Sequence, residues 1–205
     1  MRAILICLPL AACTPEIASG SYLCGPDASC PDGQACNGTK DDNAGLEAET
    51  CVLESLARPF ACSPQLNAEP DNTMDEAHVI PTLACVSAPF TIERGCMEAQ
   101  DSADWLTFVV PSACASVGVN ARLTFPYAFE ELALELWDVD ANMMVADAAE
   151  CVQGAESGAI RRCLDLQLVP GKTYAVRVSP TGEGDCDGDC AYNRYSLSVQ
   201  LGPPG

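Results

Sequence analysis

The sequence predicts an all-β protein, in which an antiparallel, jelly-roll-like β-sandwich over residues 69–201 follows a small disulfide-rich segment. Three observations predict this fold. Apolar and polar residues alternate in successive stretches, which is the period of half-buried antiparallel strands. Turn-forming residues separate these stretches, and no helical stripe interrupts them. The 14 cysteines in 205 residues indicate an oxidising compartment and a chain held by disulfides.

Composition excludes several classes of function. The chain has 10 Lys and Arg against 29 Asp and Glu, a formal charge of -19, which would repel the phosphates of nucleic acid and anionic lipid surfaces. Apolar residues make up 48%, too many for a disordered acidic chain. No apolar stretch reaches the roughly 18 residues that a membrane-spanning helix needs.

The first twelve residues have the features of an export signal: one positive charge, a short apolar run and then small residues. Leu10-Ala11-Ala12-Cys13 resembles the lipobox of bacterial lipoproteins, which implies that Cys13 carries lipid and anchors the chain in the membrane. Without Cys7 and Cys13, twelve cysteines remain, an even number that can pair completely. An ordinary cleaved signal or a misassigned start is the alternative. Thr14 favours the outer membrane or cell surface.

Residues 13–62 are expected to form a cysteine-rich stalk, because their cysteines lie among turn formers with little apolar periodicity. So small a segment cannot offset its chain entropy by burial alone, and disulfides must hold it. We interpret it as a rigid spacer, with a partner-binding knot as the alternative. Its cysteines are Cys24, Cys30, Cys36, Cys51 and Cys62.

A linker over residues 63–72 leads into the strands of the sandwich, and a short helical turn is expected at 74–78. Alternation or continuous apolar character then predicts strands in order along the chain. These strands cover 105–110, 117–125, 132–136, 164–168, 174–178 and 195–201.

Five short motifs occur in a fixed order over this region. They are Glu-Pro-Asp-Asn-Thr at 69–73, Asp-x-x-Asp-Trp at 101–105, Leu-x-Leu-Trp-Asp at 134–138, Pro-Gly-Lys-Thr-Tyr at 170–174 and Tyr-Ser-Leu-Ser-Val at 195–199. Together they resemble the bacterial pre-peptidase C-terminal domain, whose relatives include the collagen-binding domains of bacterial collagenases. The resemblance implies a compact β-sandwich that accompanies secreted enzymes as a binding module. This chain departs from the pattern in lacking a peptidase and in exchanging Asp and Asn in the opening motif.

The resemblance also implies a calcium site, because calcium prefers several converging oxygen ligands. The alternative is that these are solvated loop acids and that Asp104 caps a turn. The ligands carried over are Glu69, Asp71, Asn72, Asp101 and Asp104.

A second calcium candidate lies in the acidic stretch Asp185-Cys186-Asp187-Gly188-Asp189-Cys190. Alternating Asp185, Asp187 and Asp189 resemble a calcium loop, but the spacing departs from the EF-hand template. A Cys186–Cys190 disulfide that closes a hairpin tip is the preferred interpretation.

Trp137 is the candidate ligand-binding residue. If Leu132, Leu134 and Leu136 point inward, Trp137 must point outward, where its ring could stack on a sugar or a proline. The alternative is a ring that lies over neighbouring side chains. Trp105, at a strand start, is expected in the core.

The sequence does not predict an enzyme. His78 is the only histidine, and no metalloprotease, serine hydrolase or phosphate-loop motif occurs. The carboxylate pairs Glu130–Glu131 and Asp138–Asp140 could in principle hydrolyse a glycoside, but such pairs arise by composition in so acidic a chain.

Sequence proximity suggests the disulfides Cys85–Cys96 and Cys151–Cys163, with Cys62–Cys114 joining stalk to sandwich, although connectivity cannot be deduced from sequence.

The expected function is therefore non-catalytic. We expect an exported, membrane-anchored lipoprotein of the cell envelope, whose sandwich binds an extracellular polymer or an envelope protein, with or without calcium. A structural envelope component with no specific ligand is the alternative, and a hydrolase is the least favoured hypothesis.

Overall fold

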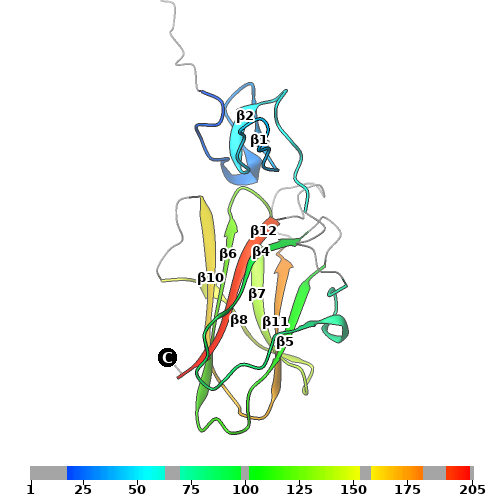
Figure 1. Ribbon diagram of the computed structural model, residues 1–205, viewed down its shortest axis with the longest axis vertical. Helices are drawn as coiled ribbons and strands as arrows, with labels where there is room; N and C mark the ends of the chain where they lie inside the picture. Colours follow the sequence, from blue (N-terminus) through cyan, green and yellow to red (C-terminus); the bar gives the residue numbers. More distant parts are fainter. Residues whose placement is uncertain (1–17, 63–69, 98–101, 153–157, 182–192, 204–205) are drawn as a thin grey trace, which may run out of the picture.

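The computed structural model describes residues 18–62, 70–97, 102–152, 158–181 and 193–203. It confirms an all-β fold, with two five-stranded sheets facing each other and a small module at one end (Figure 1). The module contains the 3-10 helix η1 (Pro26–Ala28) and the two-stranded sheet of β1 (Gln34–Asn37) and β2 (Thr50–Leu53). No helix in the described ranges is long and apolar enough to cross a membrane.

The first sheet of the sandwich has the strand order β4-β12-β6-β10-β9, and all of its pairs are antiparallel. The sheet therefore matches the sequence alternation. Its strands are β4 (Phe90–Met97), β12 (Asn193–Gly202), β6 (Val117–Pro126), β10 (Ala159–Leu168) and β9 (Ala149–Glu150).

The second sheet has the order β3-β5-β11-β7-β8 and is antiparallel except for the short edge strand β3, which pairs parallel with β5. The expected helical turn is η2 (Met74–Glu76), directly before β3. The strands are β3 (His78–Val79), β5 (Asp104–Val109), β11 (Thr173–Pro180), β7 (Leu132–Asp138) and β8 (Met143–Asp147).

The main core lies between the two sheets and is made by the inward residues of the alternating strands. Leu132, Leu134 and Leu136 are fully buried in it, as the sequence predicts. Phe108 and Tyr174, from neighbouring strands of the second sheet, stack with ring centroids 6.1 Å apart.

Ten cysteines form five disulfides in the described residues, which is typical of exported proteins. The predicted Cys151–Cys163 bond is present. Two bonds, Cys24–Cys36 and Cys30–Cys51, close the module.

The other two suggested pairings are wrong. Cys62 does join module to sandwich, but through Cys96, and Cys85 pairs with Cys114. The reason is that the extended strand β4 separates Cys85 from Cys96. A strand advances about 3.3 Å per residue, so two cysteines close in sequence lie at opposite ends of the sandwich.

Candidate functional site

The segment after the linker lies against the start of β5, so that parts of two sequence motifs come together. The Asn72 side-chain oxygen accepts hydrogen bonds from the Ser102 backbone N–H at 2.8 Å and from the Ser102 hydroxyl at 3.1 Å. The Trp105 N–H donates to the Asp71 carbonyl at 3.1 Å. Three of the predicted calcium ligands, Asp71, Asn72 and Asp104, therefore belong to one corner of the sandwich.

The two acids of this corner are buried. Asp71 is 6% exposed and Asp104 is 4% exposed. The carboxylate of Asp71 lies 3.6 Å from the Nε2 atom of His78, and that of Asp104 accepts a hydrogen bond from the hydroxyl of Tyr195 in the opposite sheet. Asp104 therefore links its own sheet to the other sheet of the sandwich.

Gly95 makes room for that hydrogen bond. It pairs with Tyr195 across β4 and β12, and a Cβ atom at Gly95 would come within 2.2 Å of the tyrosine ring. No side chain other than the single hydrogen of glycine fits there. The ring can thus lie flat over β4 and reach Asp104.

The buried acids fit calcium in their donor chemistry, because carboxylate oxygens are its preferred ligands. Asn72 does not fit, since its side-chain oxygen already accepts two hydrogen bonds and its role is to tether the opening segment. Within the part of the chain that the structure describes, only Cys24, Cys30 and Cys51 form a group of three close metal-ligand atoms, and all three are in disulfides.

Several predicted site residues lie outside the described residues, and their predictions stay open. They are Cys13, Glu69, Asp101, Asp185, Cys186, Asp187, Asp189 and Cys190.

Trp137 lies on the outer face of the second sheet and is half-buried, as the alternation of β7 predicts. Its ring packs edge-to-face on Trp105, with centroids 5.4 Å apart, and its Nε1 donates to Glu135 at 2.8 Å. Arg177 also donates to Glu135, at 3.1 and 3.2 Å, and its guanidinium lies 5.6 Å from the centre of the Trp105 ring. These contacts hold Trp137 in one orientation.

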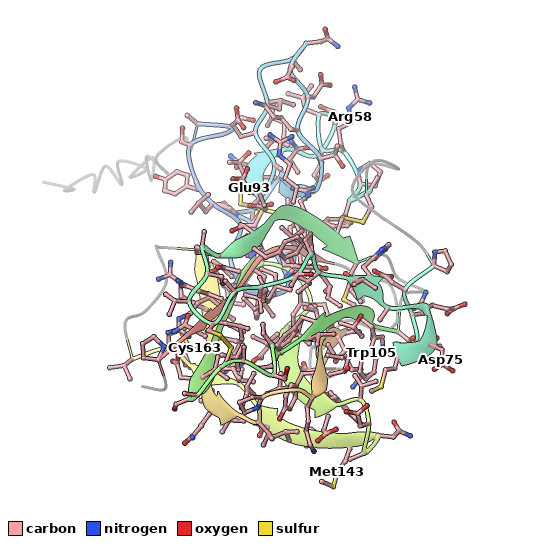
Figure 2. All side chains as sticks on the ribbon, turned by 60° about the horizontal axis from the view of Figure 1, so that its bottom comes forward. Arg58, Asp75, Glu93, Trp105, Met143 and Cys163 are labelled. Atoms are coloured by element: carbon pink, nitrogen blue, oxygen red, sulfur yellow. A yellow bond between two sulfur atoms is a disulfide. The ribbon has the colours of Figure 1, made fainter. Side chains whose placement is uncertain are left out.

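Trp105 is buried, but not in the main core as expected. It belongs to a separate cluster on the outer face of the sheet, with Ala103 and Ala175, and Met74 and Ala77 pack against this cluster. Figure 2 shows Trp105 on the same side of the molecule as Asp75 of η2. The opening segment therefore covers Trp105 and leaves Trp137 as the more accessible ring.

One carboxylate of each pair that could have suggested a hydrolase is engaged in an ion pair. Glu131 pairs with Arg162, and Asp138 pairs with Lys172 at 2.5 Å. The hydrogen bond from Lys172 and the N–H of Ala141 hold the pKa of Asp138 below its ordinary value of 3.8. Neither pair lines the cleft described next.

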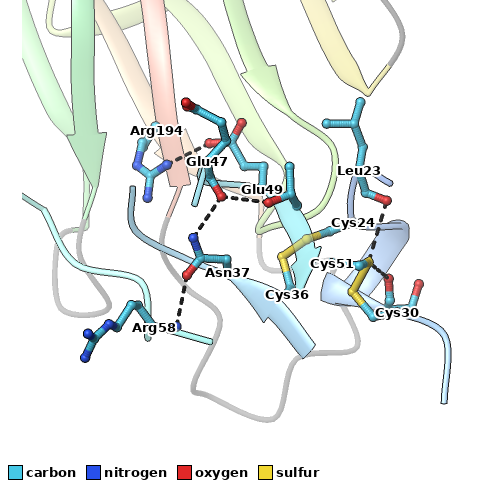
Figure 3. Close-up of a disulfide and its surroundings, with 12 residues drawn as sticks. Leu23, Cys24, Cys30, Cys36, Asn37, Glu47, Glu49, Cys51, Arg58 and Arg194 are labelled. Atoms are coloured by element: carbon cyan, nitrogen blue, oxygen red, sulfur yellow. Dashed lines mark hydrogen bonds and ion pairs between the residues drawn. A yellow bond between two sulfur atoms is a disulfide. The ribbon is translucent and has the colours of Figure 1, made fainter. Parts of the chain in front are cut away.

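A cleft of about 640 Å³ separates the module from the sandwich, and sequence reasoning did not anticipate it. Arg194 crosses it and pairs with Glu49 of the module at 2.7 Å (Figure 3). Its guanidinium lies over the ring of Phe60 at 4.8 Å. Burial lowers the pKa of Arg194, and Glu49 opposes that shift. No local sequence pattern could predict this contact, because residues 49 and 194 are far apart in the sequence.

Comparison with known proteins gives likenesses of fold. No family model matches the chain, and no curated protein matches it. Among solved structures, the chain aligns with the pre-peptidase C-terminal domain of a collagenase from Bacillus anthracis. The identity is 21% and the TM-score 0.41, over 65% of this chain and 99% of that one.

The chain is similar to the pre-peptidase C-terminal domain, as the sequence indicates. It also aligns with PliG, a periplasmic inhibitor of g-type lysozyme, from Aeromonas hydrophila. That identity is 10% and the TM-score 0.40, with 62% of this chain and 96% of that one covered. PliG from Salmonella Typhimurium aligns at 15% identity and a TM-score of 0.35, over 56% of this chain and 87% of that one.

Proposed function

We propose that this protein is a non-catalytic binding module of the cell envelope, held at the membrane by lipid on Cys13. The sandwich binds an extracellular polymer or an envelope protein through the outer face of its second sheet. The observation that carries this proposal is the fixed, half-buried ring of Trp137 on that face.

A ring fixed in this way suits binding. Trp105 packs edge-to-face against the Trp137 ring. Glu135 accepts a hydrogen bond from the Nε1 atom of Trp137 and another from Arg177. Little side-chain entropy is then lost when a ligand stacks on it. Aromatic rings held at a surface are frequent hot spots of binding interfaces.

The position of the module supports the membrane orientation. Residue 18, the first described, lies in the module, and the sandwich extends away from it (Figure 1). A lipid on Cys13 would place the module next to the membrane and the sandwich beyond it.

The test is retention of residues 14–205, with oxidised disulfides, on insoluble collagen, chitin, cellulose and peptidoglycan and on immobilised g-type lysozyme. Retention should fall about tenfold or more for Trp137→Ala. The control Tyr22→Ala removes an exposed aromatic ring from the module and should leave retention unchanged. No retention on any of these surfaces would favour the structural envelope role.

Calcium is a separate part of the proposal. Asp71 and Asp104 would hold the ion together with Glu69 and Asp101, and the ion would neutralise buried charge. Calcium at about a hundred times its dissociation constant should raise the free energy of unfolding by about 2.7 kcal/mol relative to protein in chelator. This is measured as a rise in melting temperature. Asp71→Asn should abolish that rise, and the neighbouring, exposed Asp75→Asn should keep it. An equal melting temperature with calcium and with chelator would remove the metal from the proposal.

A further inference from the structure

The end of the sandwich opposite the module, called here the distal end, consists of loops 81–89, 110–116 and 169–172 (Figure 1). These loops are tied to one another. Cys85 is bonded to Cys114, the Gly171 N–H donates to the Val110 carbonyl at 2.9 Å, and the Val110 N–H donates to the Lys172 carbonyl at 3.0 Å. The distal end is therefore a preformed surface.

The distal end is depleted of charge. In the whole chain 19% of residues are charged, but residues 79–92, 105–121, 166–171 and 195–203 contain no Asp, Glu, Lys or Arg. At the average composition about one residue in five of these segments would be charged. Lys172, at the edge, is paired with Asp138 of the same end.

Aliphatic side chains project from these loops and from the adjoining end of β5. Val86 is 69% exposed, Val109 is 51% exposed and Val169 is 55% exposed. The start of β8 adds Met143, which is 60% exposed and lies on the opposite side of the molecule from Arg58 of the module (Figure 2). Clustered exposed aliphatic groups on a rigid support are typical of an interaction surface.

The chemistry of this surface limits its partner. The one cation of these loops, Lys172, is already paired with Asp138, and the loops 81–89 and 110–116 carry no aromatic ring for a sugar. The centre of a protein interface, in contrast, is depleted of charged residues and rich in apolar ones. A complementary surface must itself be uncharged and aliphatic.

We propose that this partner is a second copy of the chain, and that two copies associate through their distal ends. The formal charge of -19 opposes contact between copies wherever acids gather, and the distal end is where that repulsion is weakest. An uncharged apolar surface is complementary to itself, as the two-fold interface of a homodimer requires. This proposal does not depend on ligand binding at Trp137.

The geometry of the pair follows from the fold. The modules lie at the two far ends of the dimer, so membrane-anchored copies would meet from facing membranes. Small contacts of this kind are weak. Salt should strengthen the association, because it screens the repulsion between two acidic chains while the apolar contact remains.

The experiment is sedimentation equilibrium of residues 14–205, without the lipid-accepting Cys13, at concentrations up to about 1 mM. We expect a monomer–dimer equilibrium whose dissociation constant falls when NaCl rises from about 50 mM to about 500 mM. Val86→Asp with Val169→Asp should raise the dissociation constant at least about tenfold. Val86→Thr with Val169→Thr, which adds no charge, should weaken the dimer in the same direction.

Val152→Asp is the matched control, because Val152 is a fully exposed valine next to Cys151, away from the distal end. It should change the dissociation constant less than about twofold, and so should Trp137→Ala. A monomer at every concentration and salt would overturn the proposal. So would a dimer that the double variants leave intact, or one that Val152→Asp weakens equally.

Discussion

The module and the sandwich are held together by different forces. The sandwich buries a large apolar core between two sheets, whereas the cluster at the base of the module consists of Cys24, Cys51 and Ala128, with Phe129 packed against it. Ala128 and Phe129 come from a sandwich loop, and the Ala28 N–H donates to the Ala128 carbonyl at 2.8 Å. The module thus depends on disulfides and on its neighbour, which is expected for so short a segment.

Tryptophan fluorescence separates the two regions, because Trp105 and Trp137, the only tryptophans, both lie in the sandwich. The module can be followed by hydrogen exchange of β1 and β2. With these two measurements, four sets of variants test whether the module and the sandwich are stabilised in different ways.

The largest effect is expected in the core of the sandwich. Leu136→Ala removes a fully buried side chain and should lower the free energy of unfolding by about 2–5 kcal/mol, measured by urea with tryptophan fluorescence. Leu56→Ala, at an exposed leucine of the module, is the control and should change it by less than about 0.5 kcal/mol. Equal losses would mean that the two regions unfold as one unit.

The second test uses two disulfides that close loops of the same length. Cys24–Cys36 and Cys151–Cys163 both have a sequence separation of 12, so replacing either pair with serine should cost about 3 kcal/mol of loop entropy. The module should lose its hydrogen-exchange protection without Cys24–Cys36. The sandwich should remain folded at 25 °C without Cys151–Cys163, since its core persists. Protection of β1 and β2 in the first variant would contradict the comparison.

The third test separates the regions at the cleft. Arg194→Met keeps apolar length but removes the partner of Glu49 and the cation above Phe60, and it should reduce the protection of the module by about 1 kcal/mol. The fluorescence transition of the sandwich should shift by less than about 0.5 kcal/mol. Arg58→Met, which removes an exposed ion pair with Asp41 inside the module, should have less effect on protection.

The smallest effect is a pH dependence of the sandwich. Lys172 lowers the pKa of Asp138 in the folded state below 3.8, so this carboxylate stabilises the fold above that pH, and the contribution is lost as pH falls through the folded pKa. Asp138→Asn should therefore destabilise the protein at pH 6 more than at pH 2. Asp140→Asn, at the exposed neighbouring acid, is the control variant. An equal loss at both pH values would indicate that Asp138 acts only as a turn cap.

The alternation of strands such as β6 and β7 could be predicted because each has one face in the core, which imposes a period of two. The sequence did not predict β8. Its residues Met143, Met144 and Val145 are all exposed, so the strand shows no alternation of apolar and polar residues. The sequence did not predict β4 either, because its pairing with β12 shifts register between Tyr195 and Leu197, which interrupts the alternation of inward and outward residues.

The candidate site was predictable to a similar extent. The alternation of inward and outward residues along β7 predicts Trp137 on the outer face, and the order of the family motifs predicts that Asp71 and Asp104 belong to one site. The sequence led us to expect Trp105 in the core, whereas it lies on the outer face, where its burial depends on Met74 and Ala77 of a segment that folds back over it. The contact between Arg194 and Glu49, like the pairing of Cys62 with Cys96, depends on how two regions dock, and no local pattern encodes that.

The Cys62–Cys96 disulfide also sets the mechanics of the molecule. It joins the end of the module directly to the end of β4, so the polypeptide between these cysteines forms a closed covalent ring. Tension applied to the module passes across the sulfur bridge into β4 and bypasses the stretch from 63 to 95. Because β4 runs alongside β12, that load acts along the strands and is shared by many hydrogen bonds at once. A proteolytic cut inside the ring would leave the two parts of the molecule attached.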